Sequence, residues 1–263
     1  MYFNKKSLKK LSLKKLSECI VCGRLPVLEL LKAGKRTVNK LIVSKTATGS
    51  TISEIICLAK QKGITIYRVP LKKIKKISDF SQGIAADVSP IEYIGLFDLI
   101  KKSKKSINPF IVLLDSVKDP HNLGAIIRNC VFFGVDGIII PKRRAVNVNM
   151  TVSKVSAGAV DHISISRVSN INLSIDLLIE NGFLIVGTTE KGELLLEKTN
   201  LTFPLAIIMG NEGFGLHNLT KKKCDFLISI PQYTNNTINQ VSSLNVSSAS
   251  AIIVYEVTKK RKI

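Results

Sequence analysis

The sequence is short of acidic residues. Asp and Glu number 19 in 263 residues, against 39 Lys and Arg, so the net charge is +20. An AT-rich genome would enrich lysine, but it would not by itself deplete Asp and Glu so far. The imbalance therefore favours a polyanionic partner, and we expect nucleic acid.

Long apolar runs are also missing, so no membrane span is expected. The basic segment 1–17 lacks the continuous apolar stretch of a signal peptide. It could be an RNA-binding tail or a transit peptide, although a solvated disordered tail fits its composition best. The five cysteines are odd in number and scattered, which is typical of a reduced compartment. Together these features predict a cytoplasmic protein.

Several common cofactor motifs are absent. Cys19 and Cys22 form a lone CxxC without the second pair of a zinc site, and we expect them in a half-buried strand. The three histidines, His121, His162 and His217, show no metal-ligand spacing, so no metal is expected. No GxGxxG follows a strand and "LKAGKRT" is not a P-loop, which argues against a classical nucleotide site.

The hydrophobic pattern predicts an α/β protein in two parts. In residues 18–92, helices are expected at 25–35, 51–63 and 71–78, and strands at 40–44, 65–69 and 83–88. The lysine-rich segment 93–109 reads as a linker between domains. In 110–263 continuous apolar runs predict a buried parallel sheet. Its strands are expected at 110–115, 137–141, 183–188, 205–209 and 227–231, and its helices at 122–134, 151–163 and 241–258.

Polar or glycine-rich segments follow three of these strands. In "LDSVKDPHNLGAIIRN", Asn122 could cap a helix and Arg128 lies one to two turns further on. In "LAIIMGNEGFGL", Gly210 and its two neighbouring glycines surround Glu212 and free the backbone to face a ligand. In "QVSSLNVSSAS", Ser243, Leu244 and Asn245 open the last helix with more polar groups than a cap needs. Each segment alone fits a tight turn or a cap, but loops at strand ends can converge on one pocket.

These three segments, with "KVSAGAVDHI", resemble the motifs of the SpoU (TrmH) family of RNA ribose 2′-O-methyltransferases, part of the SPOUT superfamily. The resemblance covers residues 110–258. Residues 18–92 are similar, through "VCGRLPVLELL" and "SQGIAADVSP", to the RNA substrate-binding domain of the RlmB branch. That branch methylates the ribose 2′-hydroxyl of guanosine in 23S rRNA. Its substrate-binding domain is similar to small RNA-binding ribosomal proteins.

The resemblance implies a trefoil-knotted methyltransferase domain, S-adenosylmethionine as methyl donor without a metal, 23S rRNA as partner, and a homodimer. Gly210, Ile230 and Leu244 match positions that bind the methyl donor. The positions that match the catalytic site of the family are Asn122, Arg128, Glu212, Ser243 and Asn245.

Two departures from the family pattern stand out. Ser81 replaces a frequent histidine, which would alter contact with RNA, and the loop 232–240 is longer than usual. Three alternatives stay open: a tRNA ribose methyltransferase, which the separate first domain disfavours, a relative that modifies another rRNA nucleotide, and a non-catalytic RNA-binding assembly factor.

Overall fold

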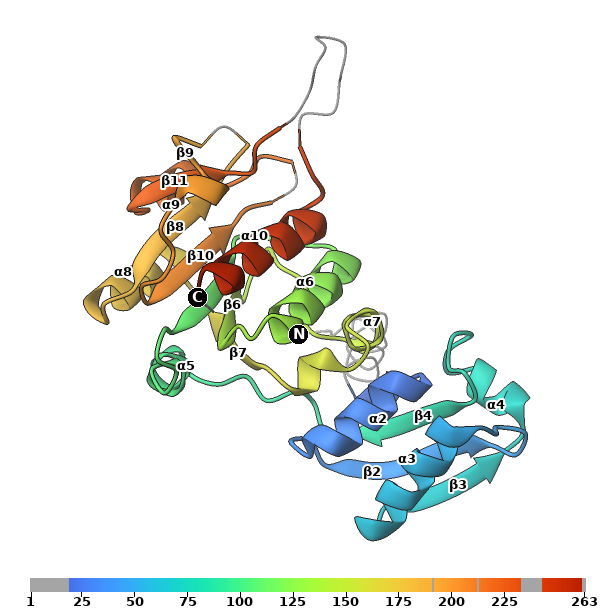
Figure 1. Ribbon diagram of the computed structural model, residues 1–263. Coiled ribbons are helices and arrows are strands. Elements are labelled where there is room, and N and C mark those ends of the chain that lie inside the picture. Colours follow the sequence, from blue (N-terminus) through green and yellow to red (C-terminus); the bar gives the residue numbers. More distant parts are fainter. Residues whose placement is uncertain (1–18, 191, 212, 233–242, 262–263) are drawn as a thin grey trace, which may run out of the picture. The chain divides into compact units, whose positions relative to one another are not determined.

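The computed structural model describes residues 19–190, 192–211, 213–232 and 243–261 (Figure 1). By internal contacts the chain divides into two compact units. One comprises residues up to 92 together with 148–162, and the other comprises 93–147 together with the residues from 163 onward. The second unit therefore takes in 93–109, which the sequence presents as a linker, and the first takes in 148–162. Each unit has its own sheet and core.

The first unit is built on a mixed four-stranded sheet of order β1-β4-β2-β3, in which only β2 and β3 pair in parallel. Helices α2 and α3 pack against this sheet around one apolar core, which includes Leu30, Leu41 and Ile55. Its elements are β1 (Ile20–Cys22), α2 (Arg24–Ala33), β2 (Val38–Ser44), α3 (Ser50–Gln61), β3 (Thr65–Val69), α4 (Leu71–Lys75) and β4 (Ile84–Val88). Cys22 lies buried in β1, whereas Cys19 lies just before this strand, so the half-buried strand predicted for both cysteines holds only for Cys22.

The prediction of a single helix at 151–163 is wrong. The segment forms a short helix α7 (Met150–Val155) and a 3-10 turn η1 (Ala159–Asp161). Between them Gly158 has a φ of +88°, a left-handed conformation that ends a helix. Burial raises the pKa of Asp161, and Arg36, 3.5 Å away, opposes this effect.

The second unit contains a seven-stranded sheet in which every pairing among the described strands is parallel. Its order is β7-β6-β5-β10-β8-β11-β9. The strands are β5 (Phe110–Leu114), β6 (Gly137–Pro141), β7 (Ser164–Val168), β8 (Leu184–Thr188), β9 (Leu194–Leu195), β10 (Leu205–Met209) and β11 (Phe226–Ser229). The helices are α5 (Leu96–Ser103), α6 (Pro120–Phe132), α8 (Ile171–Glu180), η2 (Leu196–Lys198), α9 (Asn218–Lys222) and α10 (Val246–Arg261).

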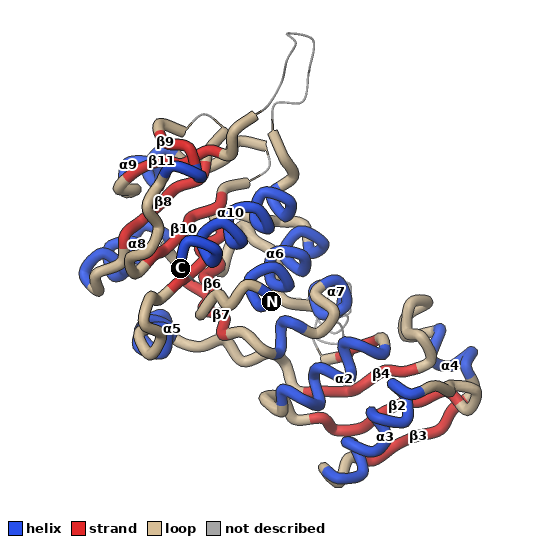
Figure 2. Tube along the Cα trace, viewed as in Figure 1, coloured by secondary structure: helices blue, strands red, loops and turns tan. Residues whose placement is uncertain are grey.

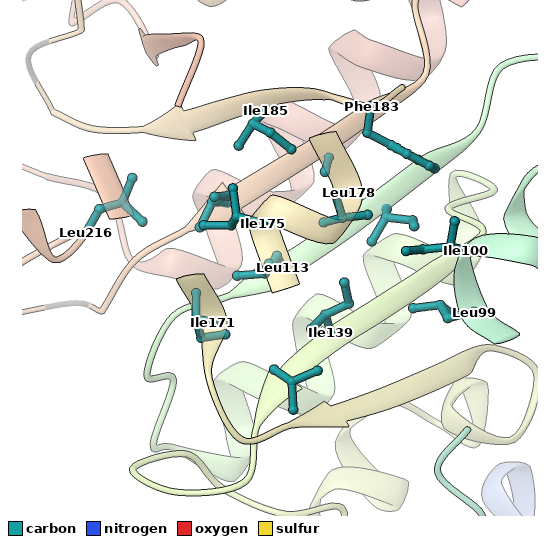
Figure 3. Packing of buried hydrophobic residues seen from close by; sticks show 14 residues of the cluster. Leu99, Ile100, Leu113, Ile139, Ile171, Ile175, Leu178, Phe183, Ile185 and Leu216 are labelled. Atoms are coloured by element: carbon teal, nitrogen blue, oxygen red, sulfur yellow. The ribbon is translucent and has the colours of Figure 1, made fainter. Parts of the chain in front are cut away.

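Helices cover both faces of this sheet. All residues of β5, β6 and β10 are buried, as expected for strands between two layers. Helices α5 and α8 contribute to a core with alternate strand residues such as Leu113 and Ile139 (Figure 3). Helices α6 and α10 run side by side (Figures 1 and 2), and the Asn129 side chain donates to Ser250 Oγ at 2.8 Å.

Part of this arrangement is not predicted by the sequence. The elements β7, α8, β9, η2 and α9 are additional, and α10 continues to Arg261. Among the described residues, no helix has both the length and the apolar content to cross a membrane.

Two basic side chains fasten the end of α10. Lys260 Nζ donates to three backbone carbonyls of 196–199. The Arg261 guanidinium donates to the backbone oxygens of Asn108 (2.7 Å), Leu201 (3.0 Å) and Phe203 (2.6 Å). Burial lowers the pKa of Arg261 to about 10, so the group is still charged at neutral pH.

Replacing Arg261 tests this attachment. We expect Arg261→Ala to lower the free energy of unfolding by about 2–4 kcal/mol, because three carbonyls lose a charged donor. Arg261→Lys should retain only part of the stability that Arg261 provides, because an ammonium group cannot donate to three carbonyls in the geometry of a guanidinium. The control is Lys259→Ala, whose side chain is 56% exposed and should change stability by less than about 0.5 kcal/mol. Urea unfolding followed by circular dichroism measures both, and equal effects at the two positions would contradict the prediction.

Candidate active site

A cavity of about 630 Å³ opens in the second unit where several strands end. It lies at the carboxyl ends of β8, β10 and β11 and at the start of α10, which is the usual ligand position in parallel α/β sheets. Its volume is in the range of sites for molecules of cofactor size. Its lining is Thr188–Glu190, Leu196, Met209–Asn211, Gly213–Gly215, Lys221, Ile228–Gln232, Ser243, Leu244, Val246, Ala249 and Ile253.

Four of the eight residues singled out from the sequence line this cavity. They are Gly210, Ile230, Ser243 and Leu244, and they come from three separate segments. The convergence of strand-end loops expected from the sequence is therefore present for the glycine-rich loop and for the start of the last helix. Three of the lining residues, Met209, Ile228 and Ile253, are apolar and at most 2% exposed, and we call them the floor of the cavity.

Gly210 is required by close packing of the backbone. A Cβ at this position would lie 2.3 Å from the carbonyl carbon of Gly215 and 2.6 Å from the backbone nitrogen of Leu216. Asn211 and Gly215 also exchange two backbone hydrogen bonds, of 3.0 and 2.9 Å. The loop therefore closes on itself directly beside the cavity, and only glycine fits at its first position.

A buried carboxylate just after β5 contacts the segment that follows this loop. Asp115 is 4% exposed, and its Oδ2 is 2.8 Å from His217 Nδ1 and 3.4 Å from Thr220 Oγ1. Asn211 donates from its side chain to the backbone oxygen of Ser116 at 2.9 Å. The loop after β10 and the loop after β5 are thus tied together by hydrogen bonds.

Asn122 and Arg128 lie on α6 and do not line the cavity. Asn122 is buried in the first turn but does not cap the helix, contrary to the role suggested by the sequence. The cap is Asp119, whose side chain accepts from the His121 N–H at 2.9 Å, with Pro120 as the first helical residue. Arg128 is an exposed residue of α6.

Asn245 acts as a helix cap in the structure. Its Oδ1 accepts from the Ser247 N–H at 2.9 Å and from Ser247 Oγ at 2.6 Å. The polar cluster at the start of α10 is therefore shared between capping by Asn245, contact with α6 by Ser250, and the cavity wall at Ser243. Glu212 lies outside the described residues, as does nearly all of the long loop after Pro231.

Some residues of the site were not singled out from the sequence. Asp115, Asn211, Phe214 and His217 order the glycine-rich loop or its rim, and Thr188 begins the cavity wall after β8. Position is a usable signal for Asp115, Asn211 and Thr188, which lie at or just beyond the carboxyl end of an apolar strand. Phe214 and His217 lie further along the loop after β10, where no such signal exists. Ser81, expected to alter RNA contact, is 1% exposed and so presents almost no surface to a ligand.

In the part of the chain that the structure describes, no three His, Cys, Asp or Glu side chains are grouped so that they could hold a metal ion. Burial raises the pKa of the Cys22 and Cys224 thiols to about 11, so both are protonated at neutral pH.

Comparison with known proteins identifies the family. The model of the SpoU rRNA Methylase family matches residues 109–255, and that of RNA 2′-O ribose methyltransferase substrate binding matches residues 20–94. A relative from Staphylococcus saprophyticus is 40% identical over 249 residues, or 94% of this chain and 97% of its own. This chain belongs to the SpoU rRNA methylase family. A second SpoU relative, from Bacillus subtilis, is 40% identical over 243 residues, or 92% of this chain and 95% of its own. Both carry the description TrmH family tRNA/rRNA methyltransferase, which matches the coarse function expected here.

Solved structures of SpoU proteins share the fold. AviRb from Streptomyces viridochromogenes, a SpoU methyltransferase in complex with AdoMet, superposes with a TM-score of 0.75 at 21% identity. The alignment covers 99% of this chain and 94% of AviRb. An AdoMet-bound rRNA methyltransferase from Sinorhizobium meliloti gives a TM-score of 0.74 at 22% identity, covering 98% and 97%. The α/β fold with a substrate-binding domain, predicted from the sequence, is confirmed.

The packing at Gly210 leads to a testable expectation. In Gly210→Ala the new Cβ would push Gly215 and Leu216 away from residue 210 and distort this wall of the cavity, so we expect affinity for S-adenosylmethionine to fall at least about tenfold. Gly213→Ala is the matched control, because its Cβ would meet only Asn211 Oδ1 at 3.4 Å. Calorimetric titration of both folded variants measures the difference. Unchanged affinity in Gly210→Ala would mean that this loop does not contact the ligand.

Proposed function

We propose that this protein transfers a methyl group from S-adenosylmethionine to the ribose 2′-hydroxyl of a guanosine in 23S rRNA. The observation that carries the proposal is the convergence of Gly210, Ile230, Ser243 and Leu244 on one cavity at the strand ends. The substrate-binding match over 20–94 and the net charge of +20 support an RNA substrate. We assign binding of the methyl donor to Gly210, Ile230 and Leu244, and the catalytic site to Asn122, Arg128, Glu212, Ser243 and Asn245.

The cavity fits the methyl donor on several grounds. Its volume suits a molecule of this size, its floor is apolar, and one wall is a loop that closes tightly on itself at Gly210. When bound, the donor supplies a methyl group already activated on a positively charged sulfur. The chain then has to exclude water, fix the loop and hold the ribose oxygen in line.

Arg128 suits the RNA side of the site. A guanidinium remains protonated in proteins, so it serves as a cation rather than as a base. From its exposed position on α6 it can hold a phosphate or stabilise the oxygen as its proton leaves. Ser243, at the cavity rim, has a hydroxyl that can orient the substrate.

Methyl transfer tests the proposal directly. Purified protein with radiolabelled S-adenosylmethionine should label undermethylated 23S rRNA on a ribose, and Arg128→Ala should reduce this at least about 100-fold through loss of charge stabilisation. Lys101→Ala is a control for loss of a cation alone, because Lys101 is exposed on α5 and does not line the cavity. Label on bulk tRNA instead would favour a tRNA ribose methyltransferase. Tight RNA binding without any label would favour an assembly factor.

We also propose that the protein is a homodimer through α6 and α10. Phe132 is 81% exposed at the end of α6, and its ring packs edge-on against Phe133, which in turn contacts Tyr255 of α10. An exposed aromatic cluster of this kind is typical of an interface.

A charge at the centre of this cluster should disrupt association. We expect Phe132→Asp to sediment as a monomer and to lose methyl transfer, if the partner completes the site around Arg128. Leu173→Asp is the control, because Leu173 is 65% exposed on α8. Sedimentation velocity distinguishes the two, and a dimeric Phe132→Asp variant would exclude this surface.

A further inference from the structure

An aromatic side chain stands at the rim of the cavity. Phe214 lines the opening and is 54% exposed, whereas the floor residues Met209, Ile228 and Ile253 are at most 2% exposed. Its two neighbours in the sequence, Gly213 and Gly215, have no side chains that could cover it. A large apolar group left in water at a ligand site is a candidate contact surface.

The position of this ring is fixed by the chain. Its centroid is 5.0 Å from that of His217, and the two rings are inclined by 68°. His217 in turn pairs with the buried Asp115 at 2.8 Å. Leu216, which lies between Phe214 and His217 in the sequence, is buried in the apolar core (Figure 3) and so anchors the segment that bears Phe214.

We propose that Phe214 is a stacking platform for the base of the nucleotide that is methylated. The inference rests on the proposed function and adds a substrate-binding residue to it. Sequence-specific RNA recognition uses unstacked bases laid on aromatic side chains. The apolar floor offers a small methyl donor a buried place, so the exposed rim is free for the macromolecular substrate. Lys221 lines the same cavity and supplies a cation for the adjoining phosphate.

His217 is a positioning residue in this arrangement. It touches the platform by its ring edge and is held by Asp115, so it sets the inclination of Phe214. We expect His217→Ala to weaken RNA binding, as loss of the Phe214 ring does. We expect His217→Phe, which keeps a ring but not the pairing with Asp115, to recover only part of the lost RNA affinity.

The experiment compares Phe214→Ala and Phe214→Trp with the wild-type protein. Phe203→Ala is the matched control, because Phe203 is 53% exposed in the same unit but lies outside this cavity. Each protein is titrated with a 23S rRNA transcript in a filter-binding assay at several salt concentrations and with S-adenosylmethionine by calorimetry. Methyl transfer to the same transcript is measured in parallel.

The platform predicts a specific pattern. Phe214→Ala should weaken RNA binding about fivefold or more, the fold-change expected for loss of one base stack. Phe214→Trp should restore it, and Phe203→Ala should match the wild type. The slope of log affinity against log salt should stay unchanged, since no phosphate contact is removed.

Other outcomes overturn the inference. Weaker S-adenosylmethionine binding with unchanged RNA affinity would place the methyl donor, not RNA, against Phe214. Equal behaviour of Phe214→Ala and Phe203→Ala would make the ring an ordinary surface residue. If the wild-type protein transfers no methyl group, the proposed function fails, while the RNA titration still decides whether Phe214 contacts RNA.

Discussion

The site depends on one buried charge. Asp115 ends β5 inside the protein, and a carboxylate taken out of water needs hydrogen-bond donors to compensate for lost hydration. Its donors come from its neighbour Ser116 and from His217 and Thr220, which follow the glycine-rich loop. The carboxylate is therefore satisfied only when that loop is folded over the end of β5. The same loop forms one wall of the cavity, so the contacts that compensate Asp115 also hold this wall in place.

Much of the second unit is predictable because its strands are buried on both faces. Runs such as "FIVLL" and "GIIIP" leave no surface for a polar residue, so their pattern is unambiguous. Strand β7, "SISRV", alternates with serine and is not predicted by its sequence, although it pairs with β6 at the edge of the sheet. The segment 151–163 reads as one helix because its apolar spacing continues, while Gly158 ends it through backbone conformation. The knot implied by the family resemblance stays a prediction.

The start of α10 shows where sequence reasoning about a site reaches its limit. Six serines and asparagines lie within 242–250, and the cluster was interpreted as a ligand site because a cap needs only one. In the structure Asn245 caps the helix, Ser250 joins α10 to α6 through Asn129, and Ser243 borders the cavity. Structural and functional demands thus fall on adjacent residues. Composition reveals the total demand, but only tertiary contacts assign each residue to one of them.

The two substrates of a methyl transfer place opposite demands on one cavity, and the lining is graded accordingly. A small donor is held best when it is enclosed, which suits the buried floor of Met209 and Ile228. An RNA nucleotide remains attached to a large solvated chain, so it can be held only at the rim. In the proposed arrangement, the two glycines that flank Phe214 leave the ring open to a base. The structure gives two separate reasons for glycine in this loop: close backbone packing at Gly210, and a left-handed φ of +66° at Gly215.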